Sequence, residues 1–235
     1  MRARELFQAG RLDEAIESLG VDLRNDPTDA QRRAFLFELL SFAGNHDRAE
    51  KQLDVLGAAN SQAGLGALLY KAAIQAERLR TDMFSKGDLP SGPAPLPVSG
   101  TLNGQPFESL EDADPRIGAR LEVFAGGQYL WIPLEHVATL RMEQPSRLRD
   151  LLWSPAKLLT GPGFRGVELG EVLLPVLTPL AASNPDPLVR LGRVTEWDEL
   201  PDGRPVPAGQ KLLLVDGEEV PLLELRELIV TPRTA

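Results

Sequence analysis

The chain has 235 residues, of which 43% are hydrophobic, and it has a formal charge of −9 and no cysteine. Domains typically span about 100–200 residues, so we expect two domains. Without cysteine the sequence excludes a disulfide framework, thiolate zinc sites and thiol catalysis, and it fits a reducing compartment. The negative charge would repel phosphate, which argues against nucleic acid as a partner.

No run of about 18 apolar residues, the length that crosses a membrane, is present in the sequence. The first residues, MRARELFQAG, are amphipathic and do not read as a leader peptide. We therefore expect a cytoplasmic protein without a membrane partner.

Residues 1–86 are predicted to form a helical domain. Up to Ser85 this part contains a single proline, Pro27, and its apolar residues recur at helical spacing. The stretch NDPTDAQ offers a helix stop, followed by Thr28 or Asp29 as the cap of the next helix.

A repeat divides the helical part into pairs. AGRLDEAIESL, from Ala9, and AGNHDRAEKQL, from Ala43, share their glycine, aspartate, alanine and leucine positions at a spacing of 34 residues. A helix–turn–helix unit of this length is typical of tetratricopeptide repeats. Ala15 and Ala49 would allow close helix contacts, and each glycine would take a left-handed turn conformation. About two and a half units are present, so we expect the second domain or a partner to cover one end.

Repeat arrays generally present a concave face to a peptide or helix, and the first helix of each unit lines that face. Projecting the repeat onto this chain predicts an apolar groove that receives a partner helix. The alternative is that the leucines and alanines of this set are core contacts with the second domain. The predicted partner-binding residues are Ala34, Glu38, Phe42, Leu65, Leu68 and Ala72.

Residues 87–98 are predicted to be a linker, because their prolines and glycines interrupt both helix and strand patterns. Residues 99–235 are predicted to be β-rich. Turn dipeptides begin at Asn103, Gly126, Asp202 and Asp216, and the clearest hairpins are ARLEVFAGGQYLWIP and KLLLVDGEEVPLLEL. We expect a short helix or helical turn in PSRLRDLLWSPAKLL. The predicted fold is therefore α+β, a tetratricopeptide-like array followed by a barrel-like domain of antiparallel hairpins.

We predict no catalytic, cofactor-binding or metal-binding residue. His46 and His136 have no ligand spacing between them. Ser154 and Lys157 match a serine-x-x-lysine pattern, but no SDN or KTG element follows, so a serine hydrolase is a minor alternative. GPGFRG, from Gly161, lacks the lysine and hydroxyl residue of a phosphate-binding loop.

The sequence resembles the ImpE/TagJ family, also called SciE-type proteins, of bacterial type VI secretion systems. The resemblance spans nearly the whole chain. It rests on the helical segment that starts at Leu6, then on RDLLWSPAKL, GEVLLPVLTP and RLGRVTEWDE, with Trp153 and Trp197 as the most distinctive positions. Thr178 departs from the family pattern, in which an aromatic residue is common at this place.

The resemblance implies a non-enzymatic accessory protein of the cytoplasm. Its implied partner is the N-terminal helix of the small contractile-sheath subunit, and a link from the sheath to its AAA+ disassembly ATPase is also implied. An amphipathic helix in an apolar groove is a known binding mode, which agrees with the groove prediction. A generic tetratricopeptide adaptor of another assembly is the alternative.

Limited proteolysis tests the predicted boundary. We expect the first cleavage between Gly87 and Val98, because the linker breaks both regular patterns. Resistance there, together with cleavage between Gln62 and Phe84, would contradict the division into two domains.

Overall fold

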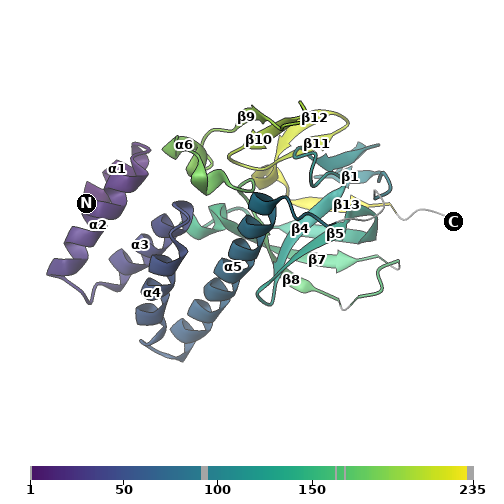
Figure 1. The fold of residues 1–235 in the computed structure, drawn as a ribbon. Helices are drawn as coiled ribbons and strands as arrows, with labels where there is room; N and C mark the ends of the chain where they lie inside the picture. The colour runs from purple at the N-terminus through teal and green to yellow at the C-terminus, as the bar shows by residue number, and fades with distance from the viewer. Residues whose placement is uncertain (1, 91–94, 162, 167, 232–235) are drawn as a thin grey trace.

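The computed structural model describes residues 2–90, 95–161, 163–166 and 168–231. Its N-terminal part is a row of helices and its C-terminal part is built from antiparallel strands (Figure 1). Together they form the predicted α+β fold. The helices of the first part are α1 (Arg2–Gln8), α2 (Leu12–Asn25), α3 (Ala30–Phe42), α4 (His46–Gly57) and α5 (Ser61–Lys86).

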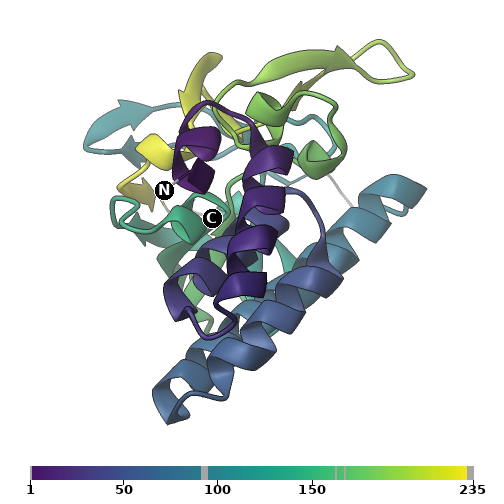
Figure 2. The ribbon, with the colours of Figure 1, turned by 90° about the vertical axis from the view of Figure 1, so that its left-hand side faces the viewer.

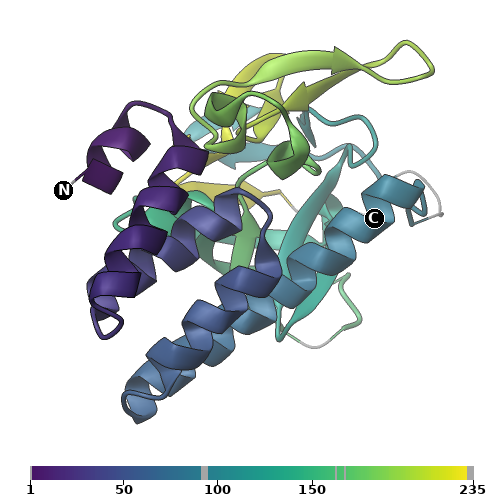
Figure 3. The ribbon, with the colours of Figure 1, turned by 60° about the vertical axis from the view of Figure 1, so that its left-hand side comes forward.

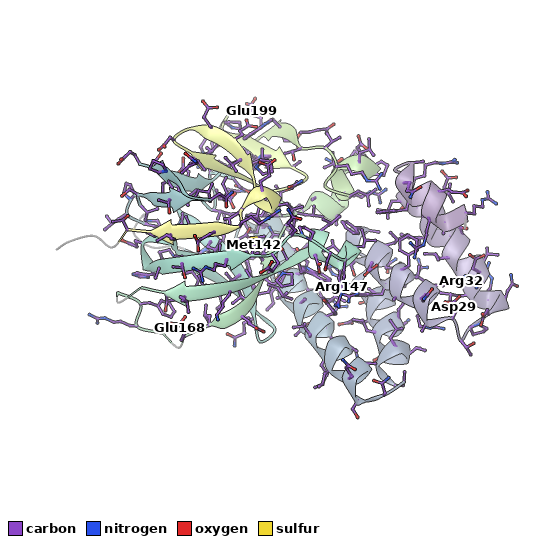
Figure 4. The ribbon with its side chains drawn as sticks, turned by 180° about the vertical axis from the view of Figure 1, so that it is seen from behind. Asp29, Arg32, Met142, Arg147, Glu168 and Glu199 are labelled. Carbon is purple, nitrogen blue, oxygen red and sulfur yellow. The ribbon has the colours of Figure 1, made fainter. Side chains whose placement is uncertain are left out.

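Local signals place the ends of these helices. The Asp29 side chain caps α3 by accepting a hydrogen bond from the Arg32 amide at 2.9 Å, and the two side chains lie together in Figure 4. The Asn60 side chain caps α5 in the same way. Gly10 and Gly44 have φ angles of +77° and +65°, so the turns between the paired helices use the left-handed conformation expected from the repeat.

Helix α5 lies between the other helices and the sheet (Figures 1 and 3). One end of the α4–α5 pair extends beyond the rest of the molecule (Figure 2). Helix α5 ends at Lys86 and the first strand begins at Gly100, while residues 91–94 of the predicted linker lie outside the described part. The two-domain division remains a prediction.

The strands of the C-terminal part form three antiparallel sheets within the described residues, with orders β2-β1-β13-β6-β7-β8-β4-β5, β10-β9 and β12-β11-β3. Their bounds are β1 (Gly100–Leu102), β2 (Gln105–Phe107), β3 (Leu110–Asp112), β4 (Arg120–Ala125), β5 (Gln128–Pro133), β6 (Val137–Met142), β7 (Trp153–Thr160), β8 (Gly170–Pro175), β9 (Glu196–Glu199), β10 (Pro205–Ala208), β11 (Leu212–Val215), β12 (Glu218–Pro221) and β13 (Glu227–Val230). Short helical segments are η1 (Leu134–His136), η2 (Leu148–Leu151), η3 (Ala181–Ser183), α6 (Pro187–Arg190) and η4 (Leu222–Glu224).

The turn dipeptides predict the hairpins correctly. Strands β4 and β5 pair around Gly126 and Gly127, and β11 and β12 pair around Asp216 and Gly217. Asn103-Gly104 joins β1 to β2 and Asp202-Gly203 lies between β9 and β10. Asn103 and Asp216 take positive φ angles of 51°, as the tight turns require.

The barrel-like expectation is wrong, because the eight-stranded sheet is open. Its outermost strands are β2 and β5, which do not pair with each other in the described structure. Helix α5 packs against β5 instead of a further strand. Hairpin signals specify which neighbouring strands pair, and they do not specify whether the two ends of a sheet meet.

The short helix or helical turn expected in PSRLRDLLWSPAKLL is the single 3-10 turn η2, and the segment from Trp153 onward is strand β7. Ala156 and Leu158 of β7 are buried, whereas Pro155, Lys157 and Leu159 between and beside them are exposed. This alternation has the period of a strand, and Pro155 disfavours a helix because it lacks an amide hydrogen.

The buried apolar side chains form two clusters. The first joins the helices to one face of the sheet and includes Leu39, Ile74, Phe124, Trp153 and Leu173. The second fills the space between the large sheet and the β12-β11-β3 sheet. The helical part and the sheet therefore share a core. No helix among the described residues is long and apolar enough to cross a membrane.

Enlarging Ala15 or Ala49 tests the helix contacts of the repeat. Both side chains have no exposed surface, so replacement by leucine should overpack the contact and cost about 1–3 kcal/mol of stability. The matched control Glu17→Leu, at an exposed site of α2, should be close to neutral. Thermal melts compare the three variants, and equal melting temperatures would contradict the repeat register.

Candidate functional site

The six predicted partner-binding residues do not share one surface. Phe42 is 1% exposed in the core, and Glu38 is buried, with its carboxylate 3.1 Å from the Arg149 guanidinium of η2. Burial raises the pKa of Glu38, although Arg149 opposes this shift. Phe42 borders a separate hollow of about 370 Å³, together with Trp153 and Ala181, so the six predicted residues do not line one common groove.

Leu65 and Leu68 are 70% and 64% exposed on α5, so they are not core residues. With Ala72, Gln75 and Leu79 they follow a spacing of three and four residues, which places all five on one helix face. We call this set the α5 seam. Leu79 is also exposed, and Gln75 is the polar member of the set, with its side chain donating to Glu50 of α4 at 3.1 Å. Apolar residues at three–four spacing are the pattern by which one helix packs along another.

A cleft of about 450 Å³ lies beside the α5 seam, between α5 and the open sheet. We call it the sheet cleft. Ala72 belongs to both surfaces, and Gly127 of the β4–β5 turn packs close to it, at a φ angle of +79°. The other lining residues are Leu69, Tyr70, Ala73, Phe124, Ala125, Gly126, Arg141, Glu143, Pro155, Ala156, Lys157, Glu171, Val172 and Leu173. The cleft is thus mainly apolar, with two cationic and two anionic side chains.

Ala34 lies on a different surface, a groove of about 580 Å³ formed by α3, α4 and α5. We call it the helix groove. Helix α5 contributes Ala63, Gly66, Ala67 and Tyr70 to it, and the predicted Leu65, Leu68 and Ala72 lie elsewhere. Of the six predicted residues the helix groove therefore contains Ala34 among its lining residues, and it is lined by a different face of α5 from the one predicted.

A buried ion pair fixes the rotation of α5. The Arg80 side chain is 1% exposed, and its Nε and Nη2 atoms donate to the Glu122 carboxylate of β4 at 2.8 and 2.9 Å. Nη2 also donates to the Leu177 carbonyl at 2.9 Å, and Nη1 donates to Glu77 at 3.0 Å. Arg80 must face the sheet to make these bonds, so the seam faces away.

The ion pair belongs to a larger buried cluster. Lys211 contacts both Glu122 and Asp112, and the Tyr129 hydroxyl donates to Glu122. Burial alone would raise the pKa of Glu122, but the charges of Arg80 and Lys211 outweigh it and lower this pKa to about 2. Burial raises the pKa of Asp112 to about 6 against the attraction of Lys211. This cluster holds strand β4, the start of β11 and helix α5 together.

Aromatic side chains reinforce the same junction. The Trp153 ring of β7 lies 6.2 Å from Tyr70 of α5 and 6.4 Å from Phe37 of α3, between ring centroids. The Trp153 indole N–H also donates to Glu77 at 3.2 Å. One of the two distinctive tryptophans of the sequence is therefore a junction residue, whereas Trp197 on β9 is 42% exposed.

The charge cluster was not predicted from the sequence. Its signal was a charged residue beside apolar strand residues, Glu122 within LEVFA and Lys211 before LLLV. Such residues are rarely buried unless they are paired. No local pattern pairs Glu122 with Arg80, because 42 residues separate them.

The candidate chemical residues are not brought together. Ser154 is buried and Lys157 is exposed on strand β7, where positions three apart point to opposite faces. Burial lowers the pKa of His46, and His136 packs against the Phe164 ring. Of Gly161–Gly166, position 162 lies outside the described residues. No group of histidine and acidic side chains in the described structure could hold a metal ion.

Thr178 has a local structural task. It is buried, and its hydroxyl oxygen accepts a hydrogen bond from the Gly209 amide at 2.9 Å. The Thr178 amide donates in turn to the Gly209 carbonyl at 2.8 Å. The Thr178 side chain thus satisfies a backbone amide in the β part.

The fold defines an α+β protein in which a row of helices packs on an open antiparallel sheet. The ImpE protein family matches residues 104–229. The type VI secretion system accessory component TagJ of Pseudomonas aeruginosa is 36% identical over 269 aligned positions, which cover 100% of this chain and 93% of that protein. The chain therefore belongs to the ImpE/TagJ family.

A solved structure supports the fold. The crystal structure of protein VPA1032 from Vibrio parahaemolyticus has a TM-score of 0.86, covering 99% of this chain and 98% of that chain at 22% identity. The arrangement of helices and sheet described above is thus shared with an experimentally determined structure.

Replacing Glu122 tests the buried cluster. Glu122→Gln would leave Arg80 and Lys211 with one carboxylate fewer, and removing one partner of a buried pair typically costs about 3–5 kcal/mol. Because the pKa of Glu122 is depressed in the folded protein, its contribution is present above the unfolded pKa and is lost as the pH falls toward 2.

Urea unfolding at neutral and acidic pH measures this effect. The difference between wild type and Glu122→Gln should shrink as the pH falls below about 4.5, the ordinary pKa of glutamate. The control Glu227→Gln breaks the exposed pair with Arg141 and should cost at most about 1 kcal/mol. Equal costs for the two variants at neutral pH would contradict the role of the cluster.

Proposed function

We propose that this protein is a non-catalytic, cytoplasmic accessory component of a type VI secretion system. We further propose that it binds the amphipathic N-terminal helix of the small contractile-sheath subunit and links the sheath to its AAA+ disassembly ATPase. The full-length similarity to the accessory component TagJ supports assignment of the protein to a type VI secretion system. The apolar seam of α5 supports the binding of a helix.

The α5 seam is the observation that carries helix binding. Leu65, Leu68 and Leu79 expose roughly half or more of their side-chain surface on one face of a long helix, at 70%, 64% and 57%. An exposed apolar strip of this kind is unfavourable in water unless a partner covers it. A partner helix with apolar residues at positions i, i+3, i+4 and i+7 matches the spacing of the seam.

The sheet cleft would hold the second side of that helix. Its apolar lining from β4, β7 and β8 continues from Ala72 onto the sheet. The lining also contains charged side chains of both signs. Charged side chains on the flank of the partner helix would therefore find groups of opposite charge in the cleft, which are Arg141, Lys157, Glu143 and Glu171. A helix on the seam would thus bury an apolar face between α5 and the sheet.

The helical array supports an adaptor role in general. We interpret α1–α5 as a tetratricopeptide-like array, since Gly10 and Gly44 lie in equivalent turns and Ala15 and Ala49 lie at equivalent buried positions. Such arrays typically act by presenting surfaces to other proteins. The same reasoning would suit an adaptor of another assembly, and the identity of the bound helix separates the two.

Replacing Leu68 with glutamate tests the proposal. The charge would face the apolar side of the bound helix, and affinity for a synthetic N-terminal helix of the sheath subunit should fall by about 2 kcal/mol or more, the scale of an interface hot spot. The fold should survive, because Leu68 is 64% exposed. Fluorescence anisotropy measures the affinity, and a thermal melt of the same variant measures stability.

Val21→Glu is the matched control. Val21 is 47% exposed on α2, away from the seam, so this variant should bind the sheath helix like the wild type. Unchanged affinity of a folded Leu68→Glu variant would exclude the α5 seam as the site. Absence of binding to the wild type would contradict the sheath subunit as the partner.

A further inference from the structure

The helix groove has no part in the function proposed above. It lies on the opposite face of α5 from the seam. Ala67 and Tyr70 line the groove together with residues of α3, whereas Leu65 and Leu68 are exposed on the other side of the helix. Its volume of about 580 Å³ exceeds the 450 Å³ of the sheet cleft. The two surfaces therefore differ in position and in the residues that line them, apart from Tyr70.

Small side chains line much of the helix groove. Ala30 and Ala34 of α3 face Ala63, Gly66 and Ala67 of α5, so neither helix fills the space between them. Phe37, Leu53, Val55 and Leu56 add larger apolar surface, and Val55 is 51% exposed. A partner would therefore insert large aliphatic side chains, for which the groove provides depth and apolar contact.

The charges at the helix groove have one sign. Arg33 and Arg149 are its charged lining residues, and the lining described contains no carboxylate, in a protein with a formal charge of −9. Arg33 donates to the Gln52 side chain at 2.7 Å and to the Pro27 carbonyl at 2.5 Å. Both acceptors are neutral, so these bonds hold the guanidinium in position without neutralising its charge.

Arg149 stands at the sheet end of the groove. Its Nε atom donates to the Tyr70 hydroxyl at 2.8 Å, and its Nη1 atom pairs with Glu38 at 3.1 Å. A guanidinium has five N–H donors, so Nη2 retains donors for a further acceptor. The groove thus presents the guanidinium of Arg33 on α3, held by neutral acceptors, and N–H donors of Arg149 on η2, whose charge is balanced by Glu38.

A helix is the conformation that fits this surface. The walls are mainly helices, and the other lining residues Pro27, Thr28, Ala59 and Asn60 lie in turns, so the described lining offers no strand edge to an extended chain. An extended segment would bury unpaired amides and carbonyls there, whereas a helix satisfies its own.

We infer that the helix groove is a second docking surface, which takes an acidic amphipathic helix of a protein partner. The aliphatic side chains of this helix lie between α3 and α5, and its carboxylates face Arg33 and Arg149. This inference goes beyond the proposed function and does not depend on the α5 seam. A chain that holds one helix on each face of α5 joins two partners.

Two synthetic peptides test the inference on the full chain. Each has about 15 residues, the length at which isolated helices begin to form, with one leucine stripe flanked either by glutamates or by lysines. The glutamate peptide should bind at least about tenfold more tightly than the lysine peptide, because like charges across an interface are unfavourable. Fluorescence anisotropy at two salt concentrations measures both affinities, and the preference should decrease at the higher salt.

Variants assign the peptide to the groove. Arg33→Glu should weaken binding of the glutamate peptide by about tenfold, whereas Lys51→Glu, the same charge change at an exposed site of α4, should have little effect. Ala30→Glu serves as a second groove variant. It places a carboxylate in the first turn of α3, where the helix dipole favours negative charge, so the fold should be retained.

The outcomes separate this inference from the proposed function. The inference is supported if the glutamate peptide no longer binds Arg33→Glu and Ala30→Glu but still binds Leu68→Glu. This result supports the helix groove whether or not the sheath-subunit helix binds the α5 seam. Equal affinity for the two peptides overturns the inference, as does binding that is lost in Leu68→Glu and retained in Ala30→Glu. Melting curves of all variants exclude unfolding as the cause.

Discussion

The bidentate pair between Arg80 and Glu122 is the contact on which the arrangement of the molecule depends. Removing both charges from water is costly, and the cost is offset only when geometry and additional hydrogen bonds are favourable. Here Leu177, Lys211 and Tyr129 supply those bonds around the pair. A small rotation of α5 would break them and leave charges buried without partners, so the pair specifies one orientation of the helix against the sheet.

That orientation determines what each face of α5 does. The face that carries Arg80 and Phe84 is buried against the sheet, and the face that carries Lys71 and Arg78 forms ion pairs with acidic residues of α4. The remaining surface is left for the α5 seam on one side and the helix groove on the other. The exposed leucines are therefore a consequence of a constraint inside the protein, which holds Leu65, Leu68 and Leu79 in solvent.

Local patterns predicted the elements of the fold, and long-range contacts decided how those elements meet. Turn dipeptides specified the hairpins, and the glycines at positions 10 and 44 specified the helix turns, because each signal acts within a few residues. Closure of the sheet and the rotation of α5 depend on pairs far apart in the sequence, such as Arg80 with Glu122. No periodicity encodes such a pair, so the open sheet and the correct face of α5 were not predicted.

The same limit explains why the predicted site residues separated. The repeat register treated α5 as a further repeat helix, for which packing on α4 alone would set the rotation. In the protein α5 also packs on β4 and β5, and Arg80 is the residue that the sheet binds. Ala34 lines the helix groove between α3, α4 and α5, whereas Leu65, Leu68 and Ala72 lie on the seam with the rest of their helix face.

The two proposed docking surfaces lie on one firmly held helix, and this has a mechanical consequence. Coupling between sites requires an element with two arrangements that both ligands bias. Helix α5 is fixed by a buried ion pair on the sheet side and by ion pairs to Asp54 and Glu50 on the α4 side, so rotation is not available to it. Occupation of the seam would then leave the groove unchanged. On the proposed function, partners bound at these surfaces would be held at a constant distance and angle, which suits an accessory component that acts by position.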